Sequence, residues 1–195
     1  MKTDIILAGV GGQGILSIAT VIGNAALADN LYLKQAEVHG MSQRGGDVQS
    51  NLRISSNPVS SDLIPLAGAD VIISLESMEA LRYVPYLSKE GWIVTNTVPF
   101  VNIPDYPQLT DIDSELMNFN NVVAFDMDAV AKEVASPRAS NMVLLGAATP
   151  FIGIDENKIE AGIRAVFARK GETVIVSNIK AFRAGLEKAK SISLK

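Results

Sequence analysis

The sequence predicts an α/β fold: a three-layer α/β/α sandwich, Rossmann-like, with a mostly parallel but mixed sheet. Short strands with nearly continuous apolar residues alternate with segments whose apolar residues recur at helical spacing. The chain also begins with a strand, a glycine-rich turn and a helix, the context in which a G-x-G-x-x-G motif is informative. With 195 residues, 48% hydrophobic and 19% charged, the chain is expected to form one domain over residues 1–195.

The first candidate site is the turn between a strand at residues 5–8 and a helix at residues 15–28. Its candidate residues are Gly9, Gly11, Gly12, Gln13 and Gly14. The glycines allow a tight turn, and the helix N-terminus offers free N–H groups and a partial positive charge to an anion. The turn is therefore expected to bind a cofactor, another anion or a partner. The alternative is that its glycines only pack the helix against the strand.

The second candidate site is the loop between strands expected at residues 32–38 and 47–55. It contains His39, Met41, Ser42, Gln43, Arg44, Gly45 and Gly46. Its side chains are more varied than a simple turn requires, which favours a ligand or partner contact over a solvated loop with a paired arginine. Because the connection is short, the two strands are expected to be antiparallel, and alternation along residues 48–54 predicts a half-exposed strand.

The remaining elements continue the alternation. Strands are expected at residues 70–74, 92–95 and 122–125; helices are expected from residue 78 to Pro85 and at residues 126–135, 142–148, 156–168 and 179–189; residues 99–113 are expected to be an extended connection. Right-handed crossovers place the glycine turn at the carboxyl edge of such a sheet, where ligands and partners usually bind.

A third candidate site consists of aspartates near the last of these strands. Asp126 and Asp128, with Asp111 and Asp113, could hold Mg²⁺. Aspartates before a helix more often accept hydrogen bonds from its first N–H groups, so capping is the favoured interpretation. Ser140 and Asn141 are expected to act as caps in the same way.

Composition excludes several function classes. The absence of cysteine excludes disulfides, a thiolate nucleophile and a conventionally bound iron–sulfur cluster, and the single histidine, His39, excludes a common Cys/His zinc site. The net charge of −4 argues against nucleic-acid binding. No apolar run is long enough to span a membrane, and Asp4 interrupts any signal peptide, so a cytoplasmic location is expected.

One alternative is a self-sufficient Rossmann-type NAD-binding dehydrogenase. Glu37 lies 23 residues after Gly14 and could hold the ribose hydroxyls of a dinucleotide. The chain lacks a recognisable histidine or tyrosine–lysine catalytic set, which speaks against this alternative.

Three sequence blocks are more specific than the general fold. They are Ile6-Leu7-Ala8-Gly9-Val10-Gly11-Gly12-Gln13-Gly14, Gln43-Arg44-Gly45-Gly46 and Ser140-Asn141-Met142-Val143-Leu144-Leu145-Gly146-Ala147. Together they resemble the gamma-type domain of 2-oxoacid:ferredoxin oxidoreductases, over essentially the whole chain. The length of the chain and residues 34–46 look most like the beta subunits of indolepyruvate ferredoxin oxidoreductases.

The resemblance implies a non-redox subunit of an enzyme that oxidatively decarboxylates an aryl-2-oxoacid to its acyl-CoA. It implies a large alpha subunit that carries thiamine diphosphate, Mg²⁺ and iron–sulfur clusters, with CoA as co-substrate and ferredoxin as acceptor. The present chain then binds no cofactor alone, has no catalytic residues and is inactive by itself. This agrees with the absence of cysteine and of a Gly-Asp-Gly motif. Residues 9–14 and 39–46 are the expected contacts, the second as a loop facing substrate, CoA or partner.

Overall fold

Six strands form one mixed sheet in the computed structural model, which describes residues 1–39 and 45–193, with only the backbone of His39 included. The strands are β1 (Lys2–Val10), β2 (Tyr32–His39), β3 (Asp47–Ser55), β4 (Ala69–Ser74), β5 (Leu87–Asn96) and β6 (Val122–Phe125), in the order β2-β3-β1-β4-β5-β6. Among these described strands only β3 runs against the others, because it pairs antiparallel with both β1 and β2. The predicted mixed, mostly parallel sheet is confirmed.

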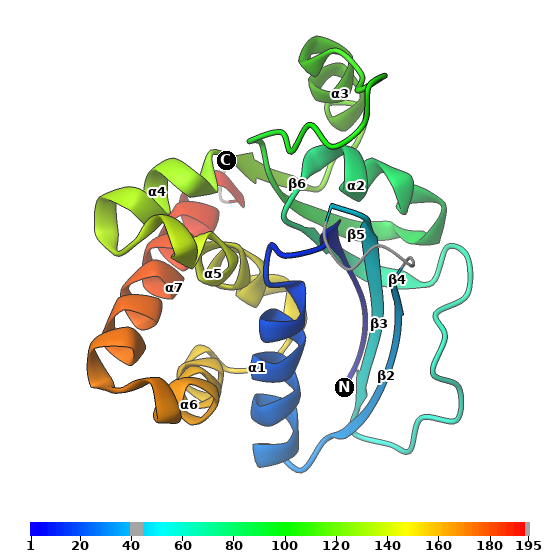
Figure 1. Ribbon diagram of the computed structural model, residues 1–195. Helices are drawn as coiled ribbons and strands as arrows, with labels where there is room; N and C mark the ends of the chain where they lie inside the picture. Colours follow the sequence, from blue (N-terminus) through cyan, green and yellow to red (C-terminus); the bar gives the residue numbers. More distant parts are fainter. Residues whose placement is uncertain (40–44, 194–195) are drawn as a thin grey trace.

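Helices cover both faces of the sheet, which gives three layers (Figure 1). One face carries α1 (Ile15–Ala28), α4 (Met127–Val134), α5 (Ser140–Ile152), α6 (Glu156–Phe167) and α7 (Glu172–Ser193); the other carries α2 (Ser77–Arg82) and α3 (Leu109–Leu116). Short 3-10 turns occupy Val84–Tyr86, Pro137–Ala139 and Ala168–Lys170. Within the described residues, no helix has the length and apolar character needed to cross a membrane.

The expected bounds of several elements need correction. The strand expected at residues 92–95 begins at Leu87, and the helix expected at residues 142–148 spans Ser140–Ile152. The connection expected at residues 99–113 is extended only up to Gln108, since α3 begins at Leu109, just after the last proline. Ile112 and Leu116 lie one turn apart and pack into the smaller core, which stabilises this helix. The last helix also begins earlier than expected, at Glu172 instead of residue 179.

The third strand is partly exposed at residues 47–49 and at Arg53, and its other residues are buried. Asn51 is 3% exposed because the connection after β3 covers it, and its side-chain oxygen accepts a hydrogen bond from Ile64 N at 3.2 Å. The same connection is held by Arg53, whose guanidinium donates to the carbonyl oxygens of Ser61 (3.2 Å) and Leu63 (3.0 Å). Polar side chains on the outer face of β3 are therefore buried under a loop, which the alternating pattern alone could not indicate.

A buried ion pair fixes β3 to β1. Arg53 donates to both carboxylate oxygens of Asp4, at 2.8 and 3.0 Å, and Lys2 approaches the same carboxylate at 2.9 Å. Burial alone would raise the pKa of Asp4, but the hydrogen bonds from Arg53 and Lys2 outweigh it and hold the pKa below its usual value.

Helix α5 is packed so closely against α7 that only glycine fits at the crossing. A Cβ added at Gly146 would lie 1.9 Å from the carbonyl oxygen of Phe182, and one at Gly185 would lie 2.0 Å from that of Val143. Because α5 also contacts β4 and β5, this crossing fixes the start of α5 over the carboxyl edge of the sheet.

Candidate functional site

The glycine turn lies at the carboxyl edge of the sheet, as predicted, directly after β1 (Figure 1). The Gln13 side chain holds the turn together: its oxygen accepts a hydrogen bond from Val10 N at 2.7 Å, and its amide donates to the carbonyl oxygen of Leu75 at 3.3 Å. Gln13 thus ties the end of β1 to the residue that follows β4, and its side chain has an architectural role in the turn.

Two glycines of the turn have backbone conformations that other residues rarely adopt. Gly12 has φ 102° and Gly14, which precedes α1, has φ 92°. Apart from its neighbours in the chain, no described residue has an atom within 4 Å of a Cβ added at Gly12, whereas a Cβ at Gly14 would lie 2.7 Å from the side-chain nitrogen of Asn141. Gly12 therefore exposes its backbone to an approaching group, and Gly14 makes room for the start of α5.

An open pocket of about 520 Å³ lies over this turn. It is lined by Gly12, Gln13, Gly14, Leu75, Asn96, Phe100, Asp128, Pro137, Arg138, Ser140 and Asn141. The lining comes from the ends of β1, β4 and β5 and from the starts of α4 and α5, segments far apart in the sequence. It combines free backbone with amide, hydroxyl, carboxylate and guanidinium groups, which can bind a polar or anionic ligand.

Asn96, at the end of β5, organises one wall of this pocket. Its side-chain oxygen accepts hydrogen bonds from Met127 N at 2.9 Å and Val98 N at 3.3 Å, and its amide donates to Asp128 at 3.4 Å. One buried amide thereby fixes the start of α4 and the start of the segment after β5. Asn96 was not predicted as a site residue, because an isolated asparagine at a strand end gives no distinctive sequence signal.

The capping interpretation is confirmed for Asp126, whose carboxylate accepts a hydrogen bond from Ala129 N at 2.7 Å. Asp111 and Asp113 lie in α3, on the other face of the sheet. Throughout the described ranges, no group of three or more histidine or acidic side chains is arranged to hold a metal ion.

The capping prediction for Ser140 and Asn141 is wrong. Helix α5 begins at Ser140, and its N-cap, Ala139, makes no side-chain hydrogen bond. Ser140 donates back to the carbonyl oxygen of Pro137 at 3.3 Å, and the Asn141 amide reaches the carbonyl oxygen of Gly14 at 3.4 Å. The side-chain oxygen of Asn141 is buried without a partner among the described residues.

The described part of the second candidate loop is joined to the glycine turn. Gly11 N donates to the carbonyl oxygen of Gly46 at 2.8 Å, and Gly45 N donates to that of Gly11 at 3.3 Å. The two loops predicted to be functional therefore meet in one place. His39 ends β2, and Met41, Ser42, Gln43 and Arg44 lie outside the described residues. Gly9 lies within β1, near its end, where it pairs with Val48.

A buried cluster of acidic and tyrosine side chains lies beside the loops and was missed by the sequence analysis. Glu76 is fully buried before α2; its carboxylate accepts hydrogen bonds from Glu79 N at 2.9 Å and from the hydroxyl of Tyr106. Asp47, the first residue after the second loop, accepts the hydroxyl of Tyr83 at 2.8 Å. Burial is the main cause that raises the pKa of both tyrosines, and the hydrogen bonds to the carboxylates raise it further. Both hydroxyls therefore stay protonated and act as donors.

Helix α2 therefore links the start of β3 to the segment after β5. Tyr83, at one end of α2, binds Asp47, and Glu76, at the other end, binds Tyr106. Burial also raises the pKa of Glu79, and the hydrogen bond from Arg82 only partly offsets this effect. The sequence signal was weak: acidic residues in a first helical turn look like ordinary helix-start residues, and the tyrosines come from segments with no pattern of their own.

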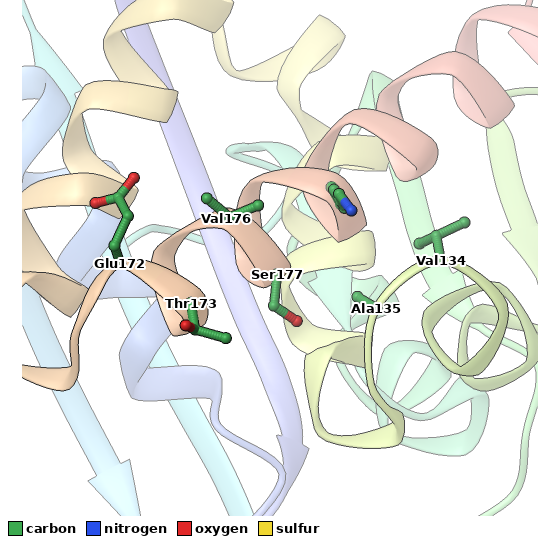
Figure 2. Close-up of a pocket in the computed structure, with 7 residues that line it drawn as sticks. Val134, Ala135, Glu172, Thr173, Val176 and Ser177 are labelled. Carbon is green, nitrogen blue, oxygen red and sulfur yellow. The ribbon is translucent and has the colours of Figure 1, made fainter.

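A second pocket, of about 470 Å³, lies between the end of α4 and the first half of α7 (Figure 2). It is lined by Val134, Ala135, Glu172, Thr173, Val176, Ser177 and Lys180, and it shares no residue with the first pocket. Its one acidic group, Glu172, pairs with Arg164 at 3.3 Å. This pocket contains none of the predicted site residues.

Comparison with known proteins supports the resemblance seen in the sequence. The family model described as pyruvate ferredoxin/flavodoxin oxidoreductase matches residues 4–188. Indolepyruvate oxidoreductase subunit IorB of Archaeoglobus fulgidus is 36% identical over 201 residues, which cover 97% of this chain and 96% of the relative.

Two solved structures have the same fold. The keto/oxoacid ferredoxin oxidoreductase gamma subunit from Geobacter sulfurreducens is 25% identical, with a TM-score of 0.72 over 97% of this chain and 99% of that chain. A 2-oxoglutarate:ferredoxin oxidoreductase from Magnetococcus marinus, solved with 2-oxoglutarate, coenzyme A and succinyl-CoA, gives 0.75 at 25% identity. There the match covers 97% of this chain but only 31% of the longer chain.

Glu37, the residue proposed for an NAD site, lies in β2 opposite Ser50. The relatives are subunits or domains of ferredoxin-linked or 2-oxoacid oxidoreductases, and they give no support to an independent NAD-binding dehydrogenase. The match over residues 4–188 and the 36% identity over nearly the full length of IorB both exceed what a shared fold alone requires. The chain therefore belongs to the pyruvate ferredoxin/flavodoxin oxidoreductase family.

Proposed function

We propose that this chain is the small, non-redox subunit of a 2-oxoacid:ferredoxin oxidoreductase that oxidises indolepyruvate or a related arylpyruvate to its acyl-CoA. The observation that carries the proposal is the identity of 36% with IorB over nearly the full length of both chains. The match covers 96% of IorB, so the comparison extends over nearly the whole of that subunit.

The absence of cysteine supports the proposal that the redox cofactors are bound by a second subunit. A chain without cysteine has no conventional ligand for an iron–sulfur cluster. In this proposal, the clusters, thiamine diphosphate and Mg²⁺ belong to a large alpha subunit, and ferredoxin accepts the electrons. Thiamine diphosphate supplies the electron sink for decarboxylation. The present chain, folded as one gamma-type domain over residues 1–195, contributes by shaping the region where substrate and CoA bind.

The pocket at the carboxyl edge supports this role. The backbone of Gly12 is open, the Asn141 oxygen is unpartnered, and Arg138 is an exposed guanidinium at the same opening. The Arg138 guanidinium can bind a carboxylate or phosphate and fix its orientation, whereas the Asn141 oxygen can only accept a hydrogen bond from a donor. We therefore propose that residues 9–14 and the loop from His39 through Met41, Ser42, Gln43 and Arg44 to Gly46 face substrate, CoA or the large subunit.

The test is reconstitution from separately purified subunits. The large subunit is taken from the same source and recognised by its thiamine diphosphate motif and clustered cysteines. Viologen reduction is measured with CoA and, in turn, indolepyruvate, pyruvate and 2-oxoglutarate. We expect activity only in the mixture, with indolepyruvate as the preferred substrate. Turnover by this chain alone, or full activity of the large subunit without it, would overturn the proposed function.

A further inference from the structure

The segment between β5 and α3, residues 97–108, exposes three large apolar side chains that lie close together in the sequence. We call these residues the edge strap. Phe100, Val101 and Ile103 are 42%, 68% and 40% exposed, although they lie next to one another at the carboxyl edge. Phe100 also lines the pocket over the glycine turn. The strap thus combines an apolar outer surface with one wall of the candidate site.

The strap is held in place by hydrogen bonds along its length. Its start is fixed by Val98 N, which donates to Asn96, and its middle by the Asn102 amide, which donates to the carbonyl oxygen of Gly45 at 2.9 Å. Near its end, the hydroxyl of Tyr106 donates to the buried carboxylate of Glu76. These contacts connect the strap to β5, to the second loop and to α2, so its apolar side chains are presented by a fixed backbone.

The composition of the strap is that of the centre of a protein interface. Residues 97–108 contain a single charged residue, Asp105, and three prolines, Pro99, Pro104 and Pro107. Interface centres are depleted in charge and enriched in aromatic residues. Prolines limit the conformations that the free segment can adopt, which lowers the entropic cost of binding.

We propose that the outer surface of the edge strap is a docking site for an apolar patch on the large subunit. This inference rests on the proposed function. A partner seated on Phe100 would also cover the mouth of the pocket, so assembly and completion of the site would occur together. The Magnetococcus marinus chain supports a large partner as the occupant, because the region that matches this chain is only 31% of it. In that chain, the matching region is therefore covalently joined to a much larger remainder.

Two variants with equally exposed apolar side chains test the proposal. Val101→Asp changes the strap, whereas Leu66→Asp changes a residue of similar exposure, 68% against 67%, in the connection between β3 and β4 (Figure 1). Binding of each purified variant to the large subunit is measured by isothermal titration calorimetry. We expect Val101→Asp to raise the Kd at least about tenfold, because a carboxylate cannot be buried against an apolar patch without cost. Leu66→Asp should leave the Kd unchanged, and Ile103→Asp provides a second strap variant.

The possible outcomes separate a failure of the strap proposal from a failure of the proposed function. If both variants bind like the wild type while the wild-type mixture is active, the strap proposal is wrong and the proposed function stands. If Val101→Asp only abolishes self-association of this chain, the strap contacts a second copy and the proposal is again wrong. If the wild-type chain neither binds the large subunit nor adds activity, the proposed function itself fails.

Discussion

The helical face of the sheet and its carboxyl edge are built in different ways. The face under α1 and α4–α7 is one continuous apolar core, in which helices approach closely enough to require Gly146 and Gly185. The carboxyl edge is held mainly by single hydrogen bonds between side chains and backbone, as at Gln13, Asn96 and Asn102.

This difference separates stability from function. Close apolar packing provides most of the folding free energy and tolerates little change of volume, whereas a single hydrogen bond contributes about 0.5–1.5 kcal/mol net. Substitutions that disturb the close packing of the helical face should therefore strongly lower the free energy of unfolding. Substitutions at the carboxyl edge should lower stability less and affect the assembled enzyme more.

The largest effect is expected at the crossing of α5 and α7. Gly146→Ala places a methyl group 1.9 Å from the carbonyl oxygen of Phe182, so the two helices must separate. We expect a loss of about 3 kcal/mol or more in the free energy of unfolding, measured by urea denaturation. Gly23→Ala, inside α1, is the control: its Cβ would lie 3.2 Å from the flexible end of Leu33, and it should be nearly neutral. Equal losses for both variants would contradict the close crossing.

The buried ion pair between β1 and β3 should give the second largest effect. Asp4→Asn leaves Arg53 without its carboxylate, and we expect a loss of about 3 kcal/mol at neutral pH. The pKa of Asp4 is lowered in the folded chain, so its contribution is present above the ordinary carboxyl pKa and disappears as the pH falls through the folded pKa. The difference between wild type and variant should therefore shrink below about pH 4.

Asp62→Asn is the matched control for this pair. Asp62 and Lys34 form an ion pair at 3.0 Å in which both side chains are about half exposed, so its loss should cost only about 0–1 kcal/mol. A pH-independent effect of Asp4→Asn in denaturation between pH 3 and 7 would show that the ion pair does not stabilise the fold.

A smaller loss of stability is expected in the glycine turn. Gly12→Ala forces a side chain onto a backbone with φ 102° but meets no neighbouring atom, so only strain of about 1–2 kcal/mol is expected. The reconstituted complex should lose proportionally more activity, because Gly12 lines the pocket. Thermal denaturation of the chain and kinetics of the complex separate the two effects. A loss of stability as large as that of Gly146→Ala would show that the carboxyl edge contributes as much to folding as the helical face does.

The smallest effect on stability is expected for Arg44→Ala. This prediction rests on the sequence, because Arg44 lies outside the described residues. An exposed ion pair contributes about 0–1 kcal/mol, so the melting temperature should hardly change. The complex should assemble less tightly or show a higher KM for substrate or CoA, and Arg44→Lys should be impaired as well because it loses the planar guanidinium. Wild-type assembly and kinetics in both variants would make the loop an ordinary solvated one.

The sequence predicted the helical face better than the carboxyl edge, for a physical reason. Apolar periodicity predicted α1 and α6 closely, since these helices are stabilised by repeated burial on one face. A continuous apolar run predicted β4, which is buried on both faces of the sheet. Asn96, Glu76 and Tyr106 act through contacts between segments far apart in the chain, and no local pattern marks such contacts. The glycine turn was recognised because positive φ favours glycine, whereas the reach of Asn141 to Gly14 depends on the position of α5.

Hydrogen–deuterium exchange of the chain, alone and bound to the large subunit, tests the separation of stability from function most directly. We expect binding to slow exchange at residues 97–108 and around the glycine turn, while amides of α6 and α7 exchange at the same rate in both states. Protection confined to α6 and α7, with no change at the carboxyl edge, would contradict this expectation.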